Sequence, residues 1–113
     1  MITPRSPFFV FERIDIMKES SFQAKLRKEI EQRFPGSKTL KNDPSVNKGI
    51  PDVLVLYKNK WAALECKDSA EEMAKRKNQI YHVQKMNEMS FARFVCPENK
   101  EDVLNEMEQA FGL

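Results

Sequence analysis

The hydrophobic pattern predicts two adjacent strands in the middle of the chain. Apolar residues dominate positions 53–57 and 61–66, and a short polar segment separates these two runs. Two β-rich runs joined by a tight polar turn are typical of a β-hairpin. We therefore expect a hairpin with polar residues at its open end, where Asp52 precedes the first strand and Glu65 and Lys67 close the second.

The register of this hairpin decides which of those side chains meet. A turn centred on residues 58 and 59 places Asp52 opposite Glu65, and a turn centred one residue later places Asp52 opposite Lys67. Both registers put all three side chains on one face, whereas a one-residue loop would turn Asp52 to the other face. Cross-strand neighbours have Cβ atoms ~4.5–5.5 Å apart, so two carboxylates placed there can share a divalent cation.

Two neighbouring carboxylates at the end of an apolar hairpin repel each other. One of them is expected to bind a proton unless a cation intervenes. Mg²⁺ and Mn²⁺ prefer oxygen ligands and usually keep several waters, so two carboxylates suffice. The alternative is a surface Asp beside an ordinary Glu–Lys pair on strand ends, and spacing alone leaves both interpretations open.

Helical periodicity flanks the hairpin on both sides. We expect helices over 18–34, 69–86 (with a restart at Asn78) and 99–111. Apart from the hairpin, strands are expected near 39–40 and at 91–96. The order α-β-β-β-α-β-α predicts an α/β fold with a mixed β-sheet flanked by helices.

Composition and charge agree with one globular domain. The chain has 113 residues, 41% of them hydrophobic, and no apolar run approaches the ~20 residues of a membrane span, so we expect no membrane partner. The net charge is +2, but five acids and one base lie from Glu98 onward. A basic body with an acidic final helix suits a polyanion that approaches one face, although an ordinary scatter of charges is the alternative.

The hairpin residues also carry a resemblance to a known family. Pro51 and Asp52, followed after the turn by Glu65, Cys66 and Lys67, resemble the PD-(D/E)XK nuclease motif. The preceding Gly49 is similar to the G-x-P-D form of the VRR-NUC branch and of small phage and archaeal Holliday-junction-resolvase-like proteins. The resemblance covers roughly residues 19–96. It implies a restriction-endonuclease-like core and an Mg²⁺- or Mn²⁺-dependent endonuclease.

The resemblance also implies a role for each motif residue. Asp52, Glu65 and the backbone carbonyl of Cys66 are expected to hold the metal ion. Lys67 is expected beside the attacking water, as its orienter, its base or a cation that stabilises the developing charge. The implied reaction is metal-assisted hydrolysis of a DNA phosphodiester bond.

Glu19 is a candidate third acid. At roughly 100° per residue it falls within about 40° of Leu26 and Ile30 on the apolar stripe of the first expected helix. An acid there either stabilises the helix dipole or joins the metal site. The stretch 19–23, ESSFQ, resembles the E-x-x-apolar-Q stretch of VRR-NUC-like proteins, which favours Glu19 as a site residue.

Several residues are candidates for contact with nucleic acid, although solvated lysines and a core tyrosine are the alternatives. Asn78, Gln79 and Tyr81 match an N-Q-x-Y-like segment of the family, in which Gln79 would orient the lysine or a phosphate. His82 is interpreted as incidental, because the implied chemistry needs no imidazole. The predicted nucleic-acid contacts are Lys41, Lys48, Gly49, Lys75, Arg76, Lys77 and Gln79.

Residues 1–16 are expected to form an N-terminal extension or arm, ahead of a single nuclease-like domain at 17–113. The apolar run 8–11 lacks the features of a signal peptide and is interpreted as an extra strand or as a swapped arm in a homodimer. Cys66 and Cys96 have no zinc-site spacing and are expected to be buried thiols rather than a disulfide. We infer a cytoplasmic location, in the host cell if the protein is phage-encoded.

The most concrete functional prediction is an endonuclease that selects branched or junction DNA by its structure rather than by its sequence. The alternative is a noncatalytic DNA-binding or assembly protein on a nuclease-like scaffold. A third reading is an unrelated α/β adaptor whose acids only decorate the surface.

Overall fold

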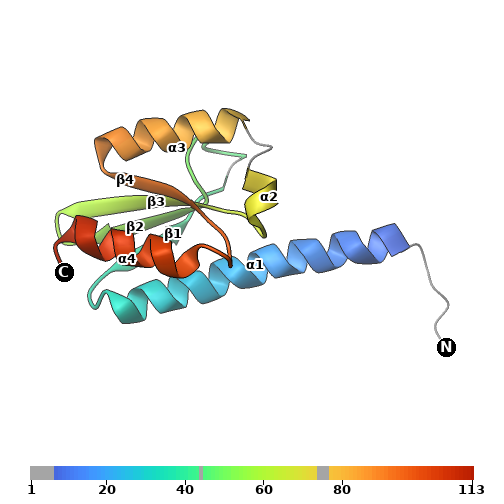
Figure 1. The fold of residues 1–113 in the computed structure, drawn as a ribbon, viewed down its shortest axis with the longest axis horizontal. Coiled ribbons are helices and arrows are strands. Elements are labelled where there is room, and N and C mark those ends of the chain that lie inside the picture. The colour runs from blue at the N-terminus through green and yellow to red at the C-terminus, as the bar shows by residue number, and fades with distance from the viewer. Residues whose placement is uncertain (1–6, 44, 74–76) are drawn as a thin grey trace.

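The computed structural model describes residues 7–43, 45–73 and 77–113, with side chains for 20–43, 45–72 and 78–113 (Figure 1). One four-stranded sheet has the strand order β1-β2-β3-β4. The first three strands are antiparallel and β4 is parallel to β3, so the sheet is mixed, as the sequence predicts. The elements are α1 (Pro7–Arg33), β1 (Lys38–Lys41), β2 (Val53–Tyr57), β3 (Lys60–Cys66), α2 (Ala70–Met73), α3 (Lys77–Met89), β4 (Phe91–Val95) and α4 (Lys100–Phe111).

The hairpin of β2 and β3 adopts the first of the two expected registers. Tyr57 pairs with Lys60 and Val53 pairs with Leu64, so the next position outward places Asp52 opposite Glu65. The turn contains Lys58 with a φ of +56°, and a positive φ at the first central residue occurs in two-residue hairpin turns. The turn therefore fixes the pairing on which the acidic pair depends.

The two faces of the sheet are covered by different helices (Figure 1). Leu26 and Ile30 of α1 and residues of α4 pack with Val53 and Leu64 in the main core cluster. Val83 of α3 packs on the opposite face, in a second cluster. Successive strand side chains point to opposite faces, so Glu65 lies on the α3 side while Cys66 belongs to the main core.

Helix α1 is longer than the sequence pattern predicts. It begins at Pro7 and runs without a break through residues 8–11, so the expectation of an extra strand there is wrong. Proline is favoured in the first helical turn, and no further proline or glycine occurs before Pro35 to end the helix. The N-terminal part of α1 extends beyond the sheet (Figure 1). The helix crosses the proposed boundary between residues 16 and 17, and the arm and its dimer role stay predictions.

The described helices α2 and α3 lie within the stretch where the middle helix is expected, and residues 74–76 between them lie outside the described part. Cys66 and Cys96 are both buried and are not joined in a disulfide, as expected. Within the described part of the chain, no helix is both long and apolar enough to cross a bilayer.

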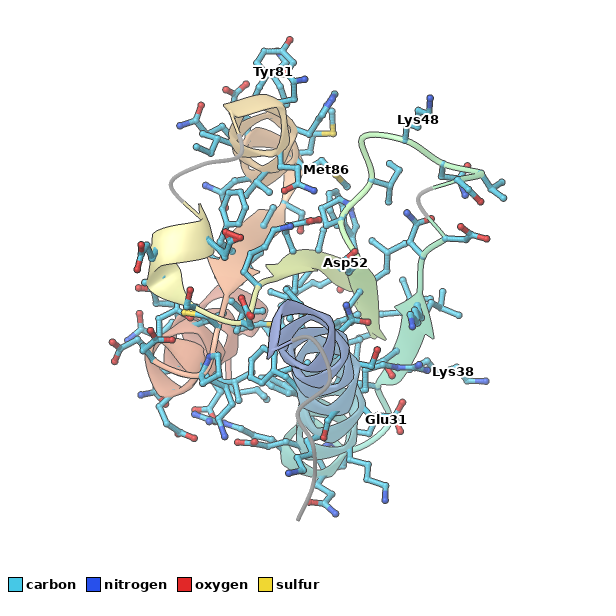
Figure 2. The ribbon with its side chains drawn as sticks, turned by 90° about the vertical axis from the view of Figure 1, so that its right-hand side faces the viewer. Glu31, Lys38, Lys48, Asp52, Tyr81 and Met86 are labelled. Carbon is cyan, nitrogen blue, oxygen red and sulfur yellow. The ribbon has the colours of Figure 1, made fainter. Side chains whose placement is uncertain are left out.

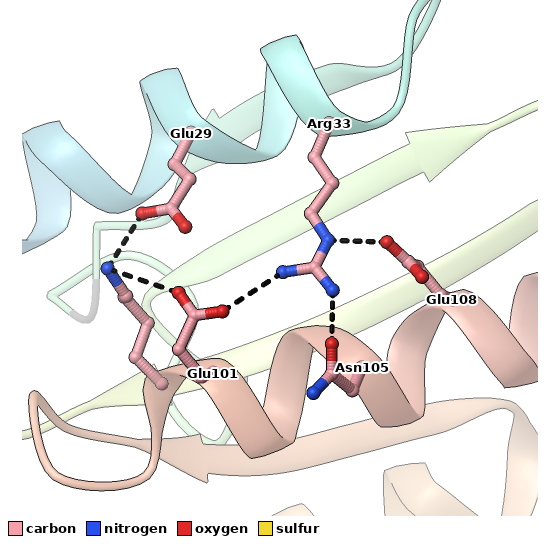
Figure 3. A network of polar contacts seen from close by, with 6 residues as sticks. Glu29, Arg33, Glu101, Asn105 and Glu108 are labelled. Atoms are coloured by element: carbon pink, nitrogen blue, oxygen red, sulfur yellow. Dashed lines mark hydrogen bonds and ion pairs between the residues drawn. The ribbon is translucent and has the colours of Figure 1, made fainter.

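A polar network joins α1 to α4 (Figure 3). Arg33 donates from Nε to Glu108 Oε1 at 2.5 Å and contacts Glu101 and Asn105 with its other nitrogens. Lys100 Nζ lies 2.8 Å from Glu29 Oε1. Acids of the final helix therefore pair with Arg33 of α1, and Lys100 of the final helix pairs with an acid of α1.

Candidate functional site

A pocket of about 510 Å³ opens at the end of the hairpin, on the α3 side of the sheet. Its walls come from the segment before β2, the end of β3 and the first turns of α3. Six of the residues predicted from sequence line it: Lys48, Gly49, Asp52, Glu65, Lys67 and Gln79. Figure 2 shows Asp52 between α3 and α1, with Lys48 on the neighbouring loop. The fold thus brings the motif residues and part of the predicted nucleic-acid surface into one concave site.

Glu65 is the most deeply placed charged residue of this pocket. It is only 5% exposed, and Lys67 Nζ lies 3.5 Å from its Oε2. Burial, followed by the charge of Asp52, raises the pKa of Glu65 to about 7, against the lowering effect of Lys67. In the absence of a cation one carboxyl therefore retains a proton near neutrality, as the sequence argument expected.

Asp52 is held across the hairpin by a backbone group. Its Oδ2 accepts a hydrogen bond of 3.0 Å from the backbone N–H of Cys66. Asp52 lines the same pocket as Glu65 and acts on its pKa, so the two carboxylates lie on one side of the sheet. Placement on one side of the sheet is one requirement for joint binding of a cation by these two carboxylates.

Among the described side chains, two acids, Asp52 and Glu65, line the pocket. Within the same set of described side chains, no group of three His, Cys, Asp or Glu is placed to hold a metal ion. A cation bound by Asp52 and Glu65 would take its other ligands from backbone oxygens and water, as Mg²⁺ commonly does.

The side chain of Glu19, the predicted third acid, lies outside the described part. Its backbone belongs to α1, and its role at the site stays a prediction.

The other predicted nucleic-acid residues divide into three groups. Lys48, Gly49 and Gln79 line the pocket, and the buried Gln79 Oε1 has no hydrogen-bond partner. Lys41 is exposed on β1 and does not line the pocket. Lys75 and Arg76 lie outside the described residues, and for Lys77 only the backbone, at the start of α3, is described.

His82 is a pocket residue that the sequence interpretation missed. It lines the pocket together with Asn78 and Gln79. Gly49 has a φ of +83°, and a Cβ added there would lie 3.0 Å from His82 Cε1. The glycine therefore suits this position because of its positive φ and because a Cβ there would crowd the imidazole. The sequence did contain a signal for this. His82 follows Gln79 by three residues and Asn78 by four, so the three side chains lie on one side of a helix.

Tyr81 is not the core residue considered as an alternative. Its side chain is 58% exposed, and Figure 2 shows it on the solvent side of α3. The core side of this helix is formed by Val83 and Met86 instead.

Compared with models of known protein families, with characterised proteins and with solved structures, the chain shows no significant match. The arrangement of the site is therefore the main basis for a functional interpretation.

Proposed function

We propose that the protein is a metal-dependent endonuclease that hydrolyses DNA phosphodiester bonds. The observation that carries this proposal is the shared pocket of Asp52, Glu65 and Lys67 at the open end of one hairpin. The PD-(D/E)XK resemblance, and the restriction-endonuclease-like core that it implies, are part of the same proposal.

The donor set suits Mg²⁺ or Mn²⁺. Asp52 and Glu65 would hold the ion together with the backbone carbonyl of Cys66, and Glu19 would contribute directly or through water. A cation would offset the burial and the charge of Asp52, which together raise the pKa of Glu65. When bound, such an ion polarises a phosphoryl oxygen and lowers the pKa of a bound water.

The remaining pocket residues would act on the phosphate and the water. Lys67, which lies 3.5 Å from Glu65, would donate to the phosphate oxygens on which charge develops. The unpartnered Gln79 Oε1 offers an acceptor that can orient the lysine or a water molecule. Lys48 adds positive charge where a phosphate backbone would approach.

The proposed substrate is branched or junction DNA, recognised by its structure. This part of the proposal follows from the resemblance, as does the homodimer, whereas the proposed cytoplasmic location follows from the two cysteines.

Cleavage assays with and without metal test the proposal. Plasmid and synthetic four-way junctions are incubated with the wild-type protein and with Lys67→Ala, in Mg²⁺ or in EDTA. We expect cutting only by the wild-type protein in Mg²⁺.

Undiminished nicking by Lys67→Ala would contradict the assignment of this residue. DNA binding without any cutting would favour the noncatalytic alternative, and the absence of both would leave an unrelated α/β adaptor.

A further inference from the structure

We propose that Tyr81 and His82 form a stacking platform for an unpaired base of the DNA strand whose phosphate occupies the pocket. This inference rests on the proposed function and narrows its substrate to DNA with an unpaired nucleotide beside the cut. The platform comprises only these two adjacent rings on α3.

The two rings have the geometry that such a platform requires. Their centroids lie 5.5 Å apart and their planes meet at 71°, which is an edge-to-face contact. Tyr81 is 58% exposed and His82 is also exposed, so both rings are accessible from solvent. Gly49 approaches the imidazole of His82, which leaves Tyr81 as the more open of the two rings.

His82 connects this platform to the carboxylates. Its ring lines the pocket that contains Asp52 and Glu65, and it packs against Gly49 at the mouth. Tyr81 lies next to it, farther from Asp52 and directed away from the sheet (Figure 2). A strand that leaves the pocket across His82 therefore meets Tyr81 next.

The charges near the platform favour a nucleic-acid strand over an apolar partner. Lys48 lines the pocket, and Lys85 follows Tyr81 by one helical turn, with its side chain half exposed and 3.9 Å from Glu88. Aromatic rings flanked by lysines are the combination that single-strand binding sites use, because the rings contact bases and the lysines contact phosphates.

Only an unpaired base can use this platform. Bases within a duplex are already stacked on both faces, whereas a base in a flap, bulge or branch point has a free face. Stacking of one base on an aromatic side chain contributes enough to change affinity about tenfold.

Fluorescence of 2-aminopurine tests the platform directly. The base is placed in a single-stranded oligonucleotide and in the matching duplex, and binding is measured in a Lys67→Ala background that leaves the DNA uncut. We expect binding of the single strand to quench the fluorescence. Tyr81→Leu should lose this quenching and bind with about a tenfold higher Kd. Tyr81→Phe should keep the quenching and the Kd of the parent protein. Binding of the duplex should be the same for all variants. Met89→Ala is the matched control, since Met89 is 71% exposed on the same helix.

Each outcome separates the platform from the nuclease proposal. Equal quenching and affinity in Tyr81→Leu and Tyr81→Phe would overturn the platform, while metal-dependent cleavage by the wild-type protein would still stand. An equal loss in Met89→Ala would overturn it too, because the effect would not be specific to the aromatic pair. Failure of the wild-type protein to bind or cut any DNA would overturn both proposals.

Discussion

The polar network between α1 and α4 and the pocket beside α3 have opposite effects on their ionisable side chains. The network favours the charged forms, whereas the pocket favours a neutral form. In the network, Arg33 and Lys100 have acidic partners at hydrogen-bond distance, and these contacts raise the pKa of both bases. In the pocket, burial and the neighbouring Asp52 raise the pKa of Glu65, which favours its neutral form. The network therefore stabilises charged side chains, while in the pocket the charge of Lys67 does not fully offset the effects of burial and of Asp52 on Glu65.

This difference indicates which polar residues serve the fold and which serve a ligand. Exposed ion pairs contribute little to stability and leave no group unsatisfied. A buried acid with a like charge beside it, next to a buried amide oxygen without a partner, is costly for the fold alone. This free-energy cost is expected at a site where a bound cation and a phosphate would supply the missing partners.

The largest expected effect is on activity. Asp52→Asn keeps an oxygen that can accept the hydrogen bond from Cys66 N–H but removes the carboxylate charge. We expect cleavage to fall at least ~10²–10³-fold with little change in melting temperature, because the lost charge belongs to the metal site. Initial rates on plasmid DNA measure this. A variant that retains wild-type rates would show that the pocket is not the site of cleavage.

The next effect is a pH dependence of stability in metal-free protein. The pKa of Glu65 rises from 4.5 to about 7 on folding, so between these values the folded state binds more protons than the unfolded state. The contribution of Glu65 to the free energy of unfolding is then fully present below about pH 4.5. It is lost as the pH rises through 7, which lowers stability by roughly 1–3 kcal/mol.

Urea unfolding in EDTA at a series of pH values measures this trend, and Glu65→Gln is its control. The difference between the two proteins isolates Glu65 from the surface acids. Mg²⁺ should restore stability above pH 7 in the wild-type protein and much less in Glu65→Gln. A wild-type curve that runs parallel to that of Glu65→Gln would contradict the raised pKa.

A smaller effect comes from the glycine at the pocket mouth. Gly36 and Gly49 both have positive φ, but an added Cβ meets nothing within 4 Å at Gly36 and meets His82 at Gly49. Gly36→Ala should lose roughly 1 kcal/mol from backbone strain alone, and Gly49→Ala about 1 kcal/mol more. Thermal unfolding compares them. The double variant Gly49→Ala/His82→Ala should recover the extra loss, and equal losses without recovery would argue against the close approach.

The smallest effect is expected in the network. Arg33→Ala removes the contacts with Glu101, Asn105 and Glu108, which lie at the surface of the molecule. We expect a loss of about 0.5–1 kcal/mol in unfolding free energy that shrinks in high salt, and unchanged cleavage per folded molecule. A large loss of cleavage in this variant would remove the distinction between the two regions.

The sequence predicted the hairpin well because its information is local. Two apolar runs and a polar turn define β2 and β3, and alternation then places Asp52 and Glu65 on one face. The choice between two registers depended on the conformation of Lys58, whose positive φ is not favoured by its residue type.

The errors concern residues whose environment is set by distant segments. His82 becomes a pocket residue because Gly49 approaches α3 from a remote loop. Tyr81 is exposed because α3 covers the sheet with Val83 and Met86 instead. The start of α1 was missed since the apolar run 8–11 has no periodicity that separates strand from helix.

Binding of a divalent cation to the pocket is the most direct test of this account. Mn²⁺ is titrated into metal-free protein at pH 8, and bound ion is measured by electron paramagnetic resonance for the wild-type protein, Asp52→Asn and Arg33→Ala. The account predicts saturable binding by the wild-type protein and Arg33→Ala, and strongly weakened binding by Asp52→Asn. Equal binding by all three proteins, or none by the wild-type protein, would contradict it.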